Sequence, residues 1–277
     1  MDSDNLMEFA VRTAQGAGEI TLRHFGVVAT ERKGDGTEVT AADREAEAYI
    51  LQTISEAFPD DGILGEEGGA AVSRSGRRWI VDPIDGTRSF SSGVPLYGVL
   101  IALEEDGVPV MGCCHLPALA ETVVAATGAG AWRNGLRARV SEVDDLADAR
   151  VVTSGLEYWR DWATAEGQAG WTRLIARARF AKTWGDCYGY MLVATGRAEI
   201  MVDPAAGAPW DYLPMVPIMA EAGGLFTTLA GAPTAAWTTG IASNGRVHDA
   251  AIGCWEAKER GDGAVQIPML LARRLEF

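Results

Sequence analysis

Cysteine and long apolar runs are scarce in this sequence of 277 residues. Only 4 cysteines occur, two of them adjacent and none in a C-x-x-C pair, which excludes a disulfide framework and argues against a zinc site. The longest apolar run, around Leu96–Leu103, is far shorter than the ~20 residues that cross a bilayer. The N-terminal residues MDSDNLMEF are acidic and precede no cleavable apolar stretch, so we expect no signal peptide and no membrane partner. These absences are typical of a cytoplasmic protein with reduced thiols.

Basic residues are also few, because 24 Lys and Arg stand against 38 Asp and Glu, a net charge of −14. Nucleic-acid binding depends on Lys and Arg contacts to phosphates, so we expect no nucleic-acid partner. An acidic protein that handles an anionic substrate needs local positive charge, and a bound metal ion can supply it. The acidity also has a simpler explanation, which is solubility.

Apolar residues, at 48% of the chain, are plentiful enough for a large core, and their spacing divides the chain into two halves. In the first half it predicts helices over residues 5–26 and 40–58, then a mainly antiparallel sheet packed on them, with strands at 79–81, 96–103, 108–114 and 121–126. In the second half, strands at 151–154, 180–183 and 199–202 alternate with helices at 171–178, 186–195 and 211–222, as in an α/β layer. We place the boundary near residue 148, giving an α+β half over 1–148 and an α/β half over 149–277.

The segment WIVDPIDGTRSF, from Trp79 to Phe90, carries the most chemical information. A buried strand runs into two carboxylates, Asp82 and Asp85, and a Pro and a Gly force the chain to turn there. Two acids at the end of a buried strand repel each other unless a cation holds them, and oxygen ligands favour a hard ion such as Mg²⁺. The amides of Gly86 and Thr87 can face an anion. Asp-Pro and Asp-Gly are also common turn sequences, which is the structural alternative.

Three further acids lie in contexts that suit a site, and each has a structural alternative. Glu66 follows a short apolar run in ILGEEGG. Asp211 in PWDYLP stands at the start of a helix, where N-capping is the commonest role of Asp. Asp43 in TAAD fits a capping box with Thr40.

Four motifs in order make the chain resemble the inositol monophosphatase family of metal-dependent phosphomonoesterases. They are GEE at 65–67, DPIDGT at 82–87, WD at 210–211 and EAGG at 221–224, and the match extends over roughly residues 5–255. The resemblance implies the layered α-β-α-β-α sandwich of the inositol monophosphatase and fructose-1,6-bisphosphatase fold. It also implies a homodimer and inhibition by Li⁺.

The resemblance further implies a role for each acid, with two or three Mg²⁺ in one site. Glu66, Asp82 and the Ile84 carbonyl would hold one ion, and Asp82 would bridge to a second ion completed by Asp85 and Asp211. Two divalent ions ~3.5–4 Å apart can activate a water and stabilise the leaving alkoxide, so the reaction needs no Ser or Cys nucleophile.

The remaining roles implied by the resemblance concern phosphate and water. Asp85 and the amides of Gly86 and Thr87 would hold the phosphate. Thr87, oriented by Asp43, would help to activate the water, and Glu66 would share in catalysis. The pairing of Asp43 with Thr87 competes with the capping box, although one carboxylate can serve both.

Two segments look like the histidinol-phosphate phosphatase branch of the family: the basic Arg88 followed by Ser-Phe, and TWGDCYGYMLVATGRAEIMVDP from Thr183 to Pro204. Arg88, Asp186 and Asp203 are therefore predicted to contact the substrate, a small phosphate ester whose amine and imidazole suit acidic partners. The alternative for Asp186 is a helix N-cap. The loop from Asp203 to Asp211 is one residue longer than usual, and the tail after Cys254 matches no pattern of the family.

Two other readings compete with this one. The chain could be a phosphatase of inositol or sugar phosphates, which a comparison of esters would distinguish. A non-catalytic metal- or phosphate-binding relative is the third reading, and the intact acid set argues against it.

Overall fold

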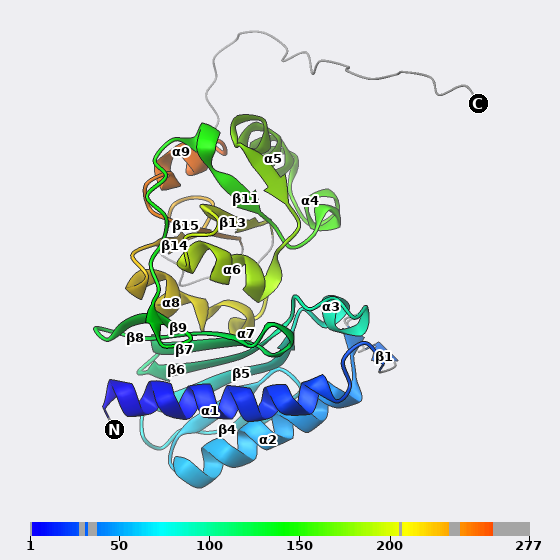
Figure 1. The fold of residues 1–277 in the computed structure, drawn as a ribbon, viewed down its shortest axis with the longest axis vertical. Coiled ribbons are helices and arrows are strands. Elements are labelled where there is room, and N and C mark those ends of the chain that lie inside the picture. The colour runs from blue at the N-terminus through cyan, green and yellow to red at the C-terminus, as the bar shows by residue number, and fades with distance from the viewer. Residues whose placement is uncertain (1, 28–30, 33–37, 205–206, 233–238, 257–277) are drawn as a thin grey trace, which may run out of the picture.

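The computed structural model describes residues 2–27, 31–32, 38–204, 207–232 and 239–256, and it has five layers (Figure 1). Helices α1 (Ser3–Leu22) and α2 (Ala41–Ala57) form the first layer and an eight-stranded sheet the second. Helices α6 (Asp186–Ala194) and α8 (Met215–Glu221) separate this sheet from a five-stranded one. Three helices cover the far face: α4 (Leu156–Asp161), α5 (Ala165–Arg177) and α9 (His248–Ile252). This arrangement confirms the α-β-α-β-α sandwich.

The first helix is shorter than its apolar spacing predicts, because it ends at Leu22 rather than near Gly26. After Leu22 the chain leaves the helix, and the side chains of Arg23 and His24 both reach Glu45 of α2. Phe25 then packs on Tyr97, with ring centroids 5.2 Å apart. These tertiary contacts override the helical pattern. The second helix begins at the predicted cap, where Thr40 and Asp43 form the capping box.

The eight-stranded sheet is antiparallel except where β3 runs parallel to β5. Its hydrophobic cluster with α1 and α2 confirms that the first sheet packs on the two N-terminal helices. In spatial order its strands are β10 (Leu136–Arg137), β9 (Gly130–Arg133), β8 (Glu121–Ala126), β7 (Val108–Leu116), β6 (Gly98–Glu105), β5 (Arg77–Asp85), β3 (Gly62–Gly65) and β4 (Ala70–Ala71). Short elements complete this half: β1 (Glu31–Arg32), β2 (Glu38–Val39), α3 (Thr87–Ser91) and the 3₁₀ helix η1 (Pro117–Leu119).

The second sheet mixes parallel and antiparallel strands, and the 3₁₀ helix η2 (Leu146–Asp148) precedes it. Its order is β12 (Phe180–Lys182), β11 (Arg150–Val152), β13 (Ile200–Asp203), β15 (Gly240–Ser243) and β14 (Leu225–Thr227), with the first three parallel. The helix predicted over 211–222 is instead two helices, α7 (Pro209–Tyr212) and α8. Pro214 and Pro217 lack the N–H groups that a continuous helix would need there.

The two sheets share a core, because one hydrophobic cluster joins the inner face of the first sheet to α6, α8 and the second sheet. It includes Leu100 and Cys114 from the first sheet, Met191 and Met215 from the helices, and Met201 from β13. The division into domains at residue 148 stays a prediction. None of the helices in the described ranges combines the length and apolar character needed to cross a membrane. Most of the tail after Cys254, which matches no pattern of the family, lies outside the described residues.

Candidate active site

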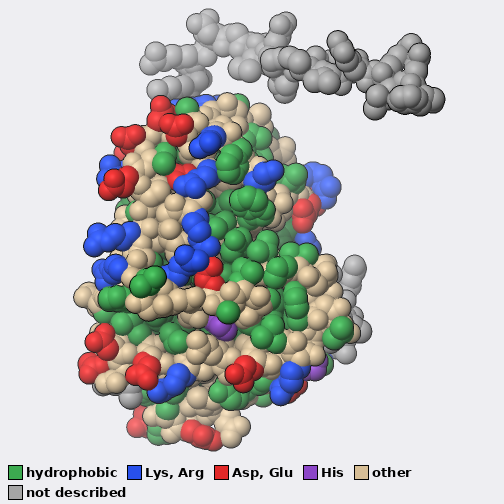
Figure 2. Space-filling view, viewed as in Figure 1, with side chains coloured by type: hydrophobic (Ala, Val, Ile, Leu, Met, Phe, Trp, Pro, Cys, Tyr) green, Lys and Arg blue, Asp and Glu red, His purple; other side chains and the backbone are tan. Residues whose placement is uncertain are grey.

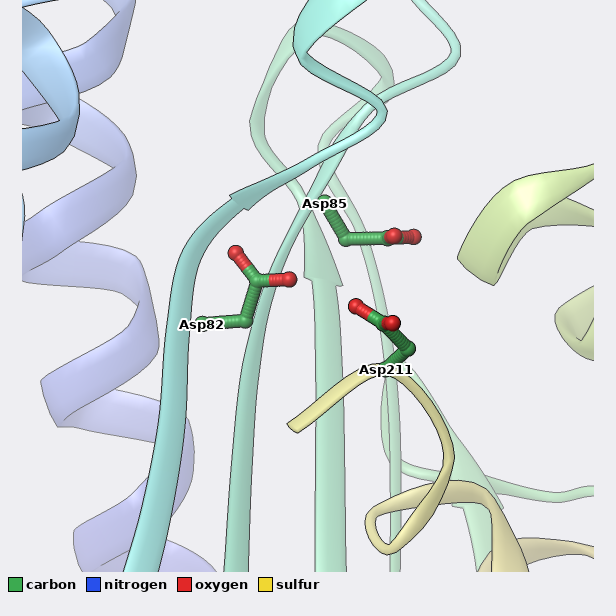
Figure 3. A group of neighbouring side chains, drawn as sticks. All are labelled: Asp82, Asp85 and Asp211. Atoms are coloured by element: carbon green, nitrogen blue, oxygen red, sulfur yellow. The ribbon is translucent and has the colours of Figure 1, made fainter. Parts of the chain in front are cut away.

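Three carboxylates from the two halves of the chain meet at the end of β5. One oxygen from each of Asp82, Asp85 and Asp211 lies within 4.8 Å of the others. Figure 3 shows the three side chains pointing toward a common space, two from the end of β5 and one from α7. The structure therefore brings together residues that are 126 positions apart in the sequence, counting from 85 to 211.

The turn at the end of β5 explains how Asp82 and Asp85 reach the same side. In a regular strand, residues three apart point to opposite faces of the sheet. Here the pairing with β6 shifts register between Asp82 and Asp85, and Pro83 has no N–H to donate to a neighbouring strand. The Ile84 N–H instead donates to Asp82 Oδ1 at 2.9 Å, which closes a local turn and holds the first carboxylate.

Asp211 occupies the third position of α7 rather than the N-cap. Its Oδ2 accepts the N–H of Ala208, the N-cap residue, at 2.6 Å, and Pro209 occupies the first helical position. A Cβ at residue 207 would lie 1.7 Å from Asp211 Oδ2, so glycine is needed at Gly207 for this carboxylate to fold back. The same side chain thus caps the helix and joins the acidic group.

Burial and mutual repulsion make the three acids unfavourable as free carboxylates. Burial, followed by the charges of Glu66, Asp85 and Asp211, raises the pKa of Asp82 well above its usual value. Burial raises the pKa of Asp85 in the same way, with a further contribution from Asp186, and it raises the pKa of Asp211 to about 7. A hard divalent cation would remove this penalty, and an all-oxygen donor set is the one that Mg²⁺ prefers. The residues therefore fit a magnesium site.

Glu66 lies next to this group without belonging to it. Its charge raises the pKa of Asp82, Asp211 and Asp43. Its N–H donates to the Val81 carbonyl at 3.2 Å, which holds the residue beside β5.

Sequence reasoning missed Glu47, which supports the loop that carries Glu66. The Glu47 carboxylate on α2 is buried and accepts the N–H groups of Glu67 at 2.7 Å and Gly69 at 3.0 Å. A Cβ at Gly65 would lie 2.7 Å from this carboxylate, so the loop approaches it closely. The available signal was an acid one helical turn after Asp43 on the buried face of α2.

The hydrogen bond between Asp43 and Thr87 that the family resemblance implies is not formed. Asp43 Oδ2 accepts the Thr40 N–H at 2.8 Å and the Thr40 hydroxyl at 2.6 Å, as the capping box requires. The Thr87 hydroxyl donates to the Ile84 carbonyl at 3.2 Å. The cap thus holds Asp43 on Thr40, although its other oxygen, Oδ1, is buried with no hydrogen-bond partner. Gly86 precedes Thr87 with φ +84°, a conformation that favours glycine.

Asp186 and Asp203 are linked through Ser154, another residue that sequence reasoning missed. Asp203 accepts the Ser154 N–H at 2.9 Å and the Ser154 hydroxyl at 2.6 Å, together with the Thr153 hydroxyl at 2.8 Å. The Ser154 hydroxyl also accepts the Asp186 N–H at 2.8 Å. The N-cap alternative for Asp186 is wrong, because Gly185 is the N-cap of α6, no side-chain cap bond forms, and Asp186 has φ +50°.

Arg88, the third predicted substrate contact, lies on α3 and forms an ion pair with Glu157 of α4 at 2.9 Å. The substrate roles of Arg88, Asp186 and Asp203 stay predictions. Because three hydrogen bonds from the protein already occupy the carboxylate of Asp203, its evident structural role is to position Ser154 and Asp186.

In the metal-free protein, we expect the melting temperature to fall as pH rises from about 6 to about 8. Burial raises the pKa of Asp211 to about 7 and that of Asp203 to about 6. A carboxyl with a raised folded pKa binds more protons in the folded state than in the unfolded state over this range, so stability is lost as it deprotonates. Bound Mg²⁺ is expected to reduce this dependence, because a cation favours the carboxylate.

The measurement is thermal unfolding at the two pH values, once with EDTA and once with Mg²⁺. Equal melting temperatures in EDTA would contradict the raised pKa values. A pH dependence of the same size with Mg²⁺ present would contradict a cation site among these acids.

Comparisons with known proteins identify relatives of this chain. The sequence model of the inositol monophosphatase family matches residues 2–258. A histidinol-phosphatase of Chlorobaculum parvum is 46% identical over 79% of this chain and 83% of its own, and one of Mycobacterium tuberculosis is 40% identical over 90% and 96%. The structure is similar to that of Thermotoga maritima IMPase, with a TM-score of 0.81 and 33% identity over 91% of this chain and 96% of that one.

Proposed function

Because this chain belongs to the inositol monophosphatase family and is a phosphoric monoester hydrolase, we propose that it hydrolyses L-histidinol phosphate to L-histidinol and phosphate, a step of histidine biosynthesis. The observation that carries the proposal is the convergence of Asp82, Asp85 and Asp211 within 4.8 Å. The choice of substrate is supported by the identity of 40–46% with two histidinol-phosphatases. The family is metal-dependent and generally uses Mg²⁺.

We assign the metal ligands as the sequence predicts them. Glu66, Asp82 and the Ile84 carbonyl are proposed to hold one ion, and Asp82, Asp85 and Asp211 a second, with two or three ions per site. When bound, divalent ions lower the pKa of water and neutralise charge on the phosphoryl and leaving oxygens. The close approach of the three aspartates and their raised pKa values support this assignment.

The other residues bind the phosphate and orient the attacking water. The Gly86 and Thr87 amides at the start of α3 are proposed to donate to the phosphate oxygens, beside Asp85. The Thr87 hydroxyl, which donates to the Ile84 carbonyl in this structure, is proposed to turn toward Asp43 and, oriented by it, to help activate the water. Asp43 Oδ1, buried and without a partner, offers an acceptor for this purpose. If Asp43 served only as a helix cap, its Oδ1 atom would have no role.

The choice of ester depends on the acids around the pocket. L-Histidinol phosphate carries an amine and an imidazole, both of which can be cationic, and Asp186 lies beside Asp85, whose pKa it raises. An inositol ring would call for neutral partners. Hydrolysis of inositol or sugar phosphates is the second candidate, favoured by the 33% identity with Thermotoga maritima IMPase. A non-catalytic relative is disfavoured because no predicted ligand is replaced.

The cytoplasmic location and the homodimer belong to the same proposal. Figure 2 shows hydrophobic side chains gathered at the centre and right of one face of the molecule, with charged groups mainly around them. Contiguous apolar surface of this kind is typical of protein–protein contact. It supports an association of two copies.

The test is phosphate release from a small panel of esters, each with Mg²⁺ and with EDTA. We expect the highest kcat/KM for L-histidinol phosphate, lower values for inositol 1-phosphate and glycerol 2-phosphate, and no release with EDTA. A higher kcat/KM for inositol 1-phosphate would contradict the proposed substrate and favour the second candidate, hydrolysis of inositol or sugar phosphates. Release that persists with EDTA would contradict metal dependence.

A further inference from the structure

An ion pair joins the two halves of the chain beside the acidic group. Arg88 follows the predicted phosphate-binding turn on α3, and Glu157 lies on α4 of the second half. Their Nη1 and Oε1 atoms are 2.9 Å apart. Figure 1 shows α3 and α4 on the same side of the molecule, one below the other. Glu157 has no role in the function proposed above.

The pair lies next to Asp186, which in turn borders the aspartate group. Asp186 Oδ2 lies 3.4 Å from the position that a Cβ would take on Gly86, and its charge raises the pKa of Asp85. Arg88 and Glu157 both act on Asp186, one favouring and one opposing its ionisation. The order from the phosphate turn outward is therefore Asp85, then Asp186, then the ion pair. A group attached to a bound phosphate would extend along this order.

Tyr158 supplies an aromatic face at the same place. The Arg88 guanidinium lies over its ring, 5.8 Å from the centroid, and the ring stacks on Trp162 with centroids 4.3 Å apart. Burial, followed by the nearby charge of Asp186, raises the pKa of Tyr158 to about 12, so the phenol is neutral at physiological pH. One cation, the Arg88 guanidinium, thus already lies against both the Tyr158 ring and the Glu157 carboxylate.

The Arg88–Glu157 pair is exposed enough to exchange partners. The side chains are 63% and 43% exposed. Exposed ion pairs contribute at most about 1 kcal/mol, so replacing one cation by another costs little. The Glu157 carboxylate folds over residue 155 so closely that a Cβ there would lie 2.8 Å from it.

We propose that Glu157 and Tyr158 select the ester by receiving its cationic end, with the ammonium or imidazolium of the substrate replacing the Arg88 guanidinium on the carboxylate and the ring. The inference rests on the proposed function, which supplies the cationic ester. It assigns specificity to α4, a helix of the half that contributes only Asp211 to the predicted metal ligands. In the protein without substrate, Arg88 occupies the place at Glu157 and Tyr158 that the cationic end of the substrate would take.

The test compares kcat/KM for L-histidinol phosphate with that for glycerol 2-phosphate, whose alcohol is uncharged. Glu157→Gln is expected to lower this ratio by about 5-fold, mainly through KM for the cationic ester, as the loss of an exposed ion pair worth about 1 kcal/mol would. Gly155→Ala is the second variant. Gly155 has φ −149°, which any residue adopts, so its added methyl group should displace the Glu157 carboxylate without changing charge and lower the same ratio.

Arg88→Gln breaks the same ion pair from the other side. Because Arg88 is itself a predicted substrate contact, this variant is expected to change kcat/KM for both esters, and only the ratio between the two esters is compared. The variant is expected to leave the ratio unchanged or to raise it, since it frees Glu157 for the substrate. If Glu157 acted only by holding Arg88, Arg88→Gln and Glu157→Gln would lower the ratio equally, and that result would overturn the inference.

The same data separate the two proposals. A wild-type protein that does not hydrolyse L-histidinol phosphate would overturn the proposed function and the inference with it. A wild-type protein that prefers this ester, with the ratio unchanged in Glu157→Gln and Gly155→Ala, would overturn the inference alone.

Discussion

Asp82→Asn is expected to abolish most of the Mg²⁺-dependent phosphate release, with a loss of about 10²- to 10³-fold in kcat, comparable to the loss of one preorganised electrostatic group. Asp82 is the acid proposed to touch two ions, and its side chain is buried against Glu66, Asp85 and Asp211. An amide removes the negative charge but keeps an oxygen that can accept the Ile84 N–H. The turn should therefore persist while the cation is lost.

Stability measurements separate this effect from misfolding. Because Asp82→Asn removes a carboxylate that its neighbours repel, the metal-free variant is expected to melt at a higher temperature than the wild type and to gain less from Mg²⁺. The control is Asp60→Asn, the same change at an exposed acid paired with Arg74. It should leave activity and the response to Mg²⁺ unaltered. Wild-type activity in Asp82→Asn would contradict the assignment of Asp82 as a metal ligand.

Glu199→Ala is expected to lower the free energy of unfolding by about 3–5 kcal/mol, as the loss of one member of a buried ion pair does. The Glu199 side chain has no exposure and accepts four hydrogen bonds, from the Arg150 N–H at 2.6 Å, its Nε and Nη2 at 3.0 and 2.6 Å, and the Ser141 hydroxyl at 2.8 Å. The variant would leave the donors of Ser141 and of Arg150, at the start of β11, without this acceptor. Urea unfolding measures the difference.

The destabilisation caused by Glu199→Ala should become smaller as pH falls. Burial acts to raise the pKa of Glu199, but the hydrogen bonds from Arg150 and Ser141 outweigh it and the pKa is lowered. A lowered folded pKa means that the contribution is complete above the unfolded value and is lost as pH falls through the folded one. The difference between wild type and variant should thus shrink in acid. Glu142→Ala is the control, because Glu142 is 90% exposed and 3.8 Å from Arg246, and its change should stay within about 0.5 kcal/mol.

Local sequence signals predicted much of the fold, because the elements depend on near neighbours. The strand over 121–126 and the start of the helix at Ala41 follow from apolar alternation and a capping box. The helix over 211–222 was wrong because the apolar pattern continues through Pro214 and Pro217, where the backbone lacks donors. Strands β3 and β4 were missed because β3 has only two apolar residues, which lie between glycines, and β4 consists of two alanines.

Some residues of the candidate site could also be identified from local sequence signals, and others could not. Asp82 and Asp85 could be identified because both stand in one turn with its own Pro and Gly. Glu47 and Ser154 could not, because each acts through partners that only folding brings near, the loop at Glu67 and the acid Asp203. The N-cap reading of Asp186 failed because its backbone is left-handed, which a capping pattern does not reveal.

The left-handed backbone at Asp186 limits which residue types can occupy this position without strain. Apart from glycine, asparagine and aspartate are the residues that adopt φ near +50° most readily. Glycine would relax the chain and asparagine would keep its shape, but neither brings a negative charge beside Asp85. Replacing Asp186 by either residue would thus remove the charge that raises the pKa of Asp85, so this negative charge and the left-handed conformation occur together at residue 186.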